Sequence, residues 1–207
     1  MSNAPFPTNP ASGRGLVIKK AQLDNEQALK YARKIEEPWY RAQALAWVAR
    51  YAPVGKVEAI AQEALEVGAE DGDPYGVVAV SAWPIRALIE RQREQLVEPA
   101  IPRLLAVSDR IEHPVSRLEA LFLLWQAVYP IGGEMRWQVQ EKFVAACRDA
   151  DSWKAADRLA WAASTLASDD PEEALELVAV LREGRVKRQA LRRIKAGEST
   201  SPRLFFW

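Results

Sequence analysis

Few residues in this chain could carry acid–base, nucleophilic or metal chemistry. The 207 residues include one histidine, His113, and one cysteine, Cys147. A Ser-His-Asp triad, a Cys-His pair or a histidine-based metal site would have to use His113, which directly precedes Pro114 and is typical of a turn. Cys147 lies in an apolar helical run, which predicts a buried, unreactive thiol. No glycine-rich phosphate loop occurs, and we expect neither a metal nor a cofactor.

One trio of residues is a candidate catalytic set. Trp153 and Asp157 are four residues apart, which places an indole and a carboxylate on one face of a helix, and Arg188 follows in the next structural unit. Trp39 stands 114 residues before Trp153, but Gln43 takes the place of the acid. The tryptophan is therefore first a feature of a structural repeat, where we expect its ring to be buried, and the catalytic interpretation is the alternative.

The charge of the chain changes sign near its C-terminal end. Acidic residues gather in 169–176, and the stretch 182–195 is basic apart from Glu183. In one interpretation the opposite charges pair across a terminal hairpin, and in the other the basic face binds an acidic protein surface or nucleic acid. The candidate binding residues under the second interpretation are Arg185, Arg188, Arg192 and Arg193.

The last ten residues, 198–207, form a polar spacer with an apolar end. An exposed cluster of aromatic rings is costly, so these side chains should be buried somewhere. Either the tail folds back over the last hairpin, or it is a short linear motif that inserts into a partner or a second copy of the chain. The apolar residues concerned are Leu204, Phe205, Phe206 and Trp207.

The elements that would position these residues repeat along the chain. The segment 35–45 reappears 76 residues later as 111–121, with matching Ile, Glu, Pro, Arg, Ala and Leu. Since 76 and 114 are two and three times 38, one period explains both offsets. Each unit contains two stretches with apolar residues at helical spacing, and about five units fit the chain.

Prolines divide the units into helices. Pro38, Pro74 and Pro114 are predicted to open second helices, because proline is tolerated in a first turn and breaks an interior. Residues 170–173, Asp-Pro-Glu-Glu, predict a further helix start. Pro84 lies within the stretch 75–92, where we expect a kinked or split helix.

The pattern Pro-x-x-Arg-x-x-Ala-Leu resembles that of HEAT-like repeats. It stands at Pro38 with Arg41 and again at Pro114 with Arg117. The resemblance implies a right-handed α-solenoid of about five helix-turn-helix repeats. It also implies that Arg41 and Arg117 are partly buried structural groups that meet carbonyls or carboxylates.

The trio also resembles the Trp, Asp and Arg set of the HEAT-like alkylpurine DNA glycosylases. The resemblance implies that Asp157 would stabilise positive charge on a sugar, while Trp153 and Arg188 would position the damaged nucleotide. Against it, 28 Lys and Arg balance 28 Asp and Glu, which removes the positive field that DNA binding relies on.

Composition limits the remaining classes. Apolar residues make up 49% of the chain, yet no run of about 18 apolar residues predicts a membrane helix. We expect a disordered leader at 1–15, one all-α domain at 16–197 and a tail at 198–207, in the cytoplasm. The favoured function is a non-enzymatic scaffold that docks a protein partner on its concave face or through its tail, and nucleic-acid binding is the less favoured one.

Overall fold

The structure is a computed structural model that describes residues 6–70, 72–198 and 206. This part of the chain contains eleven α-helices, two short 3₁₀ helices and no strand. The 3₁₀ helices are η1 (Glu94–Leu96) and η2 (Tyr129–Ile131). The all-α prediction is confirmed.

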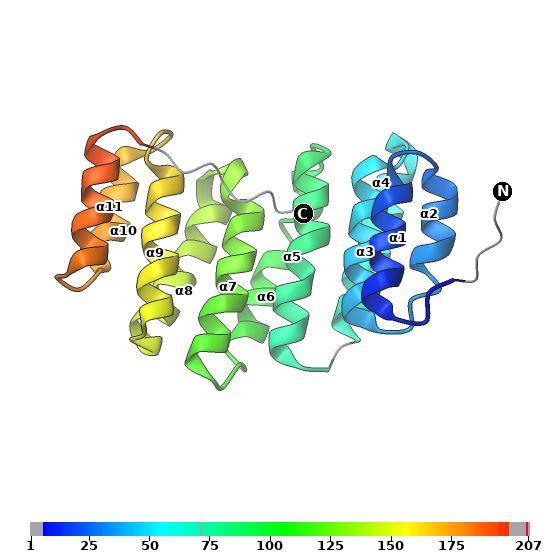
Figure 1. Ribbon diagram of the computed structural model, residues 1–207, viewed down its shortest axis with the longest axis horizontal. Helices are drawn as coiled ribbons and strands as arrows, with labels where there is room; N and C mark the ends of the chain where they lie inside the picture. The colour runs from blue at the N-terminus through cyan, green and yellow to red at the C-terminus, as the bar shows by residue number, and fades with distance from the viewer. Residues whose placement is uncertain (1–5, 71, 199–205, 207) are drawn as a thin grey trace.

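The helices stand side by side in two layers, and each packs on its neighbours along the row (Figure 1). The layer nearer the viewer, called the front layer from here on, holds the odd-numbered helices, which are α1 (Pro10–Ala21), α3 (Pro38–Tyr51), α5 (Pro74–Glu90), α7 (Pro114–Val128), α9 (Trp153–Leu166) and α11 (Arg185–Lys195). The rear layer holds the even-numbered helices, which are α2 (Asn25–Ala32), α4 (Val54–Ala69), α6 (Ala100–Ser108), α8 (Gly133–Ala150) and α10 (Pro171–Val180).

The predicted helix starts are found in the structure. Pro38, Pro74 and Pro114 are the first residues of α3, α5 and α7. Asp170 caps α10 by accepting a hydrogen bond from the backbone N–H of Glu173. The proline-based boundaries are therefore confirmed.

Two expectations about helix limits need correction. α5 runs unbroken through Pro84, which is buried, so of the two expected forms the split helix is wrong, and the kink stays a prediction. α5 packs against α3, α4 and α7, and this tertiary packing outweighs the hydrogen bond that proline cannot donate. Residues 10–15, expected to belong to a leader, form the first part of α1, where Gly13 is buried near Phe6 and Ile35.

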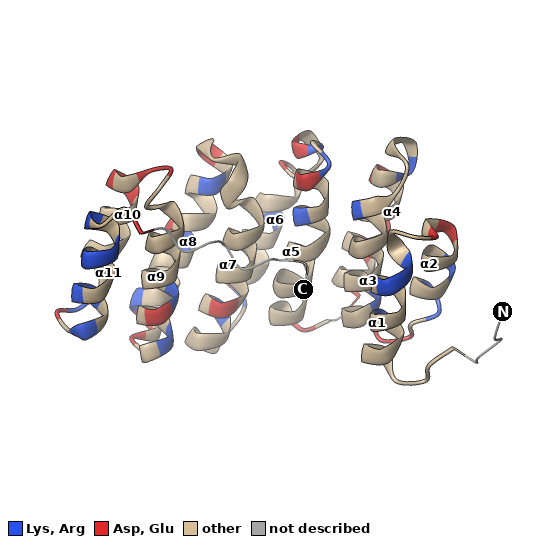
Figure 2. Ribbon diagram, turned by 45° about the horizontal axis from the view of Figure 1, so that its top comes forward, with Lys and Arg blue, Asp and Glu red and all other residues tan. Residues whose placement is uncertain are grey.

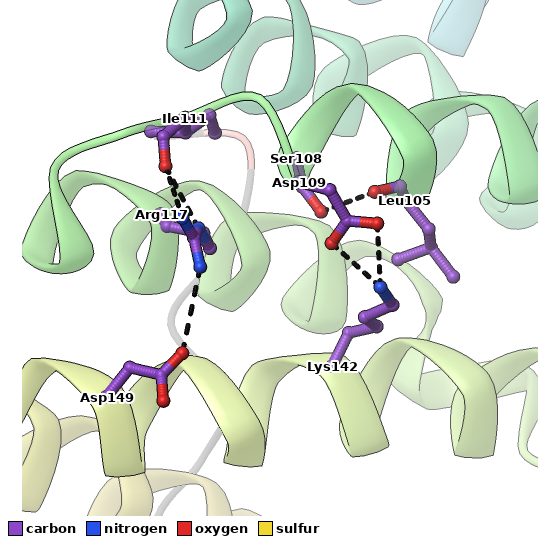
Figure 3. Close-up of polar contacts among 7 residues, drawn as sticks. All are labelled: Leu105, Ser108, Asp109, Ile111, Arg117, Lys142 and Asp149. Carbon is purple, nitrogen blue, oxygen red and sulfur yellow. Dashed lines mark hydrogen bonds and ion pairs between the residues drawn. The ribbon is translucent and has the colours of Figure 1, made fainter.

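Two arginines make the contacts implied by the repeat. Arg117 donates two hydrogen bonds to the carbonyl of Ile111, at 2.9 and 2.8 Å, and lies 3.6 Å from Asp149 on α8 (Figure 3). Arg41 likewise reaches the carbonyl of Ile35, at 3.5 Å, and pairs with Glu70 at 2.5 Å. Each arginine thus closes the turn before its own helix and ties it to the next helix of the rear layer.

A second contact joins α6 to α8 beside the Arg117 pair. Lys142 donates to both carboxylate oxygens of Asp109, at 2.7 and 2.8 Å, just after the end of α6 (Figure 3). The hydroxyl of Ser108 donates to the carbonyl of Leu105 at 2.6 Å and so satisfies a buried polar group. These polar contacts tie α8 to the end of α6 and, through Arg117, to α7.

Candidate functional site: an aromatic notch on the front layer

Phe206 packs on the front layer, far along the row from the helix it follows. Only 5% of the residue is exposed. Its ring meets Trp47 of α3 edge-on at a centroid distance of 4.9 Å, and Trp83 of α5 at 5.5 Å. We call the site formed by Trp47, Arg50 and Trp83 the notch.

A cation completes the notch. The Arg50 guanidinium lies over the Phe206 ring, 4.6 Å from its centroid, which is the geometry of a cation–π contact. Glu90 of α5 holds Arg50 in place at 2.5 Å and also binds Arg86 at 2.9 Å. The site therefore offers two indole rings and one oriented positive charge to a single ring.

The two tryptophans come together because α3 and α5 begin alike. Each lies nine residues after the proline that starts its helix, Pro38 or Pro74, and the two helices are neighbours in the layer. Trp83, Arg50 and Glu90 were not among the residues chosen from the sequence. The equal spacing from the two prolines is the signal that could have found Trp83.

A related set of contacts lies between α7 and α9. Phe122 of α7 meets Trp161 of α9 edge-on at 5.3 Å, and the Arg158 guanidinium lies 5.1 Å from its ring centroid. Glu119 holds Arg158 at 3.2 Å, as Glu90 holds Arg50. At α7 the phenylalanine belongs to the helix itself, whereas at α3 the tail supplies it.

Of the predicted tail residues, the structure describes one. Phe206 contacts α3 and α5, so the expectation that the tail covers the last hairpin is wrong for this side chain. Leu204, Phe205 and Trp207 lie outside the described residues.

The predicted basic residues are exposed, and they belong to α11, whose ribbon is largely blue with Lys and Arg (Figure 2). Glu173, one of the acids of 169–176, pairs with Arg136 of α8 at 2.5 Å and not with a basic residue of α11. For this acid, the expected pairing across the last hairpin is therefore wrong. Within the described residues, no carboxylate lies within ion-pair distance of any of the four predicted arginines, Arg185, Arg188, Arg192 and Arg193.

The trio considered for catalysis does not line one common cavity. Trp153 is 76% exposed, which also makes the expectation of a buried repeat residue wrong here. Asp157 is paired with Arg158 at 2.9 Å and borders a cavity of about 260 Å³ with Trp161 and Arg193. Trp153 and Arg188 do not line that cavity.

The single histidine caps a helix, and the single cysteine is buried in the core. His113 caps α7, where its Nδ1 accepts a hydrogen bond from the backbone N–H of Ser116 at 3.3 Å. Cys147 is buried, and burial raises the pKa of its thiol to about 12. Among the described residues no group of three His, Cys, Asp or Glu side chains is arranged to hold a metal, and no helix is long and apolar enough to cross a bilayer.

Cys147 gives a prediction for alkaline pH. In the folded state the pKa of the thiol is about 12, whereas in the unfolded chain the pKa is near 9.0. Stability should therefore fall as pH rises between these values, by about 1.4 kcal/mol per pH unit. Urea unfolding at pH 8, 9.5 and 10.5 should show a steeper loss for the wild type than for Cys147→Ala, and parallel curves would contradict the burial.

Comparison with known proteins gives no relative. No protein-family model matches the chain, and no curated protein or solved structure matches it.

Proposed function

We propose that this protein is a non-enzymatic interaction module, a right-handed HEAT-like α-solenoid of about five repeats that docks a protein partner. The repeated contacts of Arg41 and Arg117 and the two-layered row of helices support the HEAT-like interpretation. We place its action in the cytoplasm, because the single buried Cys147 suits a reducing compartment.

The burial of Phe206 in the notch carries this proposal. Hot spots of protein interfaces are enriched in Trp, Tyr and Arg, and they cluster in desolvated pockets. The notch has two of these types, and it already binds a phenylalanine that is distant in sequence. A front-layer surface that binds such a ring within the chain has the chemistry to bind one from a partner.

Trp47 contributes to the notch a hydrogen-bond donor that lacks an acceptor in the described part of the chain. Its indole Nε1 is buried and has no hydrogen-bond partner within the described residues. A buried donor without an acceptor costs about 1–3 kcal/mol, and a backbone carbonyl of a bound segment would remove that cost. The notch therefore suits an extended peptide that presents one phenylalanine with its carbonyls exposed.

A peptide titration tests the proposal. The probe is a heptapeptide with the sequence of residues 201–207, Ser-Pro-Arg-Leu-Phe-Phe-Trp. It should bind a chain truncated after residue 197, and replacing the phenylalanine that corresponds to Phe206 by alanine should weaken binding at least about tenfold. The full-length chain should bind the probe more weakly, because a tethered tail competes at high effective concentration.

Two protein variants sharpen the titration. Trp83→Ala should lose binding as the altered peptide does, and Trp153→Ala, an exposed tryptophan outside the notch, should bind like the parent. Equal affinity of all variants would contradict the proposal. Sizing the full-length and truncated chains side by side would show whether the tail instead links two copies.

The alternative function is a nucleic-acid-processing enzyme of the DNA glycosylase type. The cavity that Asp157 shares with Trp161 and Arg193 is the observation in its favour. Release of an alkylated base from DNA by the purified protein, abolished by Asp157→Asn, would overturn the interaction module.

A further inference from the structure

A second cavity lies at the far end of the row from the notch. Its volume is about 420 Å³, and it is enclosed by the end of α8, the start of α9 and the connection between α10 and α11. Its floor is apolar and consists of Cys147, Ala155, Leu159 and Leu181, all of which are buried. We call it the terminal cavity.

The walls of the terminal cavity are basic. Arg148, Arg182 and Arg185 line it, against one acid, Asp151. Asp151 pairs with Arg182 at 2.5 Å, while Arg148 and Arg185 have no carboxylate within ion-pair distance among the described residues. Two positive charges are therefore left to face a ligand at the mouth of an apolar space.

Unsatisfied backbone donors add to this charge. Gly184, which also lines the cavity, is the N-cap residue of α11 and provides no side-chain acceptor for the N–H groups of the first turn. These groups carry the positive end of the helix dipole. They supplement the arginines as partners for a carboxylate.

We propose that the terminal cavity binds an acidic segment of a partner protein, with one apolar side chain inserted between two flanking carboxylates. The apolar side chain fills the space above Leu159 and Leu181, and the carboxylates meet Arg148 and Arg185. A nucleic acid would supply the negative charge without an aliphatic group to fill the apolar floor. This site is separate from the notch and does not depend on it.

The test uses a labelled peptide, Glu-Glu-Glu-Leu-Glu-Glu-Glu, and fluorescence anisotropy with the full chain. Arg185→Gln should weaken binding about fivefold. Ala156→Phe, which places a ring in the cavity, should weaken it further. Arg192→Gln removes the same charge from the same helix outside the cavity and should change binding less than about twofold.

Peptide controls separate the apolar and charged contributions. A peptide with serine in place of leucine should bind more weakly, and one with glutamine in place of glutamate should not bind. If Arg185→Gln and Arg192→Gln weakened peptide binding equally, or if Ala156→Phe had no effect, the peptide would be bound only by the general positive charge of α11. Either result would overturn the proposal. Tighter binding of single-stranded DNA that Ala156→Phe leaves unchanged would overturn it as well. The heptapeptide titration measures binding at the notch separately, so either binding proposal can be contradicted without the other.

Discussion

Trp125→Ala is expected to lower the free energy of unfolding by about 3–5 kcal/mol. Trp125 is fully buried in α7, where its ring stacks on Phe122 and Phe143. Its indole N–H also donates to Gln140 on α8 at 2.9 Å. Truncation therefore opens a large void and leaves the Gln140 side-chain oxygen without its donor. Urea unfolding followed by far-UV circular dichroism measures the loss.

Trp153→Ala is the matched control for this prediction. The same change of side chain at a residue that is 76% exposed should alter stability by less than about 0.5 kcal/mol. A comparable loss at both positions would contradict the distinction between buried and exposed tryptophans.

Glu173→Ala should cost about 3 kcal/mol, because it breaks a chain of polar contacts between α8 and α10. Glu173 binds Arg136 at 2.5 Å and accepts a hydrogen bond from Gln140 at 2.6 Å. The Arg136 and Glu173 side chains are only 16% and 15% exposed. Removing the carboxylate leaves a nearly buried guanidinium without its main partner, and thermal unfolding would report the loss.

Two further variants test the cause of that loss. Glu172→Ala alters an exposed neighbour and should be close to neutral. The double variant Arg136→Met with Glu173→Leu should recover much of the stability, because replacing both charges leaves none unpaired. Failure of the double variant to recover would assign the loss to packing rather than to the stranded charge.

The repeat in the sequence predicted those parts of the fold that local rules determine. Pro38 and Pro114 begin helices because proline suits a first turn, and Arg41 and Arg117 meet carbonyls and carboxylates as the resemblance implied. Pro84 was expected inside a kinked or split helix, and the split did not occur because α5 packs on α3, α4, α6 and α7, which overrides the local preference. Local signals alone do not include that contribution.

The site was harder to predict because it depends on distant parts of the chain. Phe206 was identified as a residue that must be buried, but its place depends on where the tail meets the front layer. Trp39 and Trp153 match in sequence yet differ in exposure. Trp39 stacks on Tyr75 near the start of the next front-layer helix, whereas α11 begins with Arg185 and Val186 and offers no ring. Neighbouring units, and not the residue itself, decide whether a repeated tryptophan is partly buried, as Trp39 is, or exposed.

The most direct test of the notch is the position of the Phe206 ring between two indoles. In ¹H–¹⁵N spectra, edge-on aromatic contacts displace the indole N–H signals of nearby tryptophans through ring currents. Phe206→Ala should therefore shift the signals of Trp47 and Trp83 and leave those of the exposed Trp137 and Trp153 in place. Unchanged Trp47 and Trp83 signals would contradict the account, because the front layer would then hold no aromatic ring from the tail.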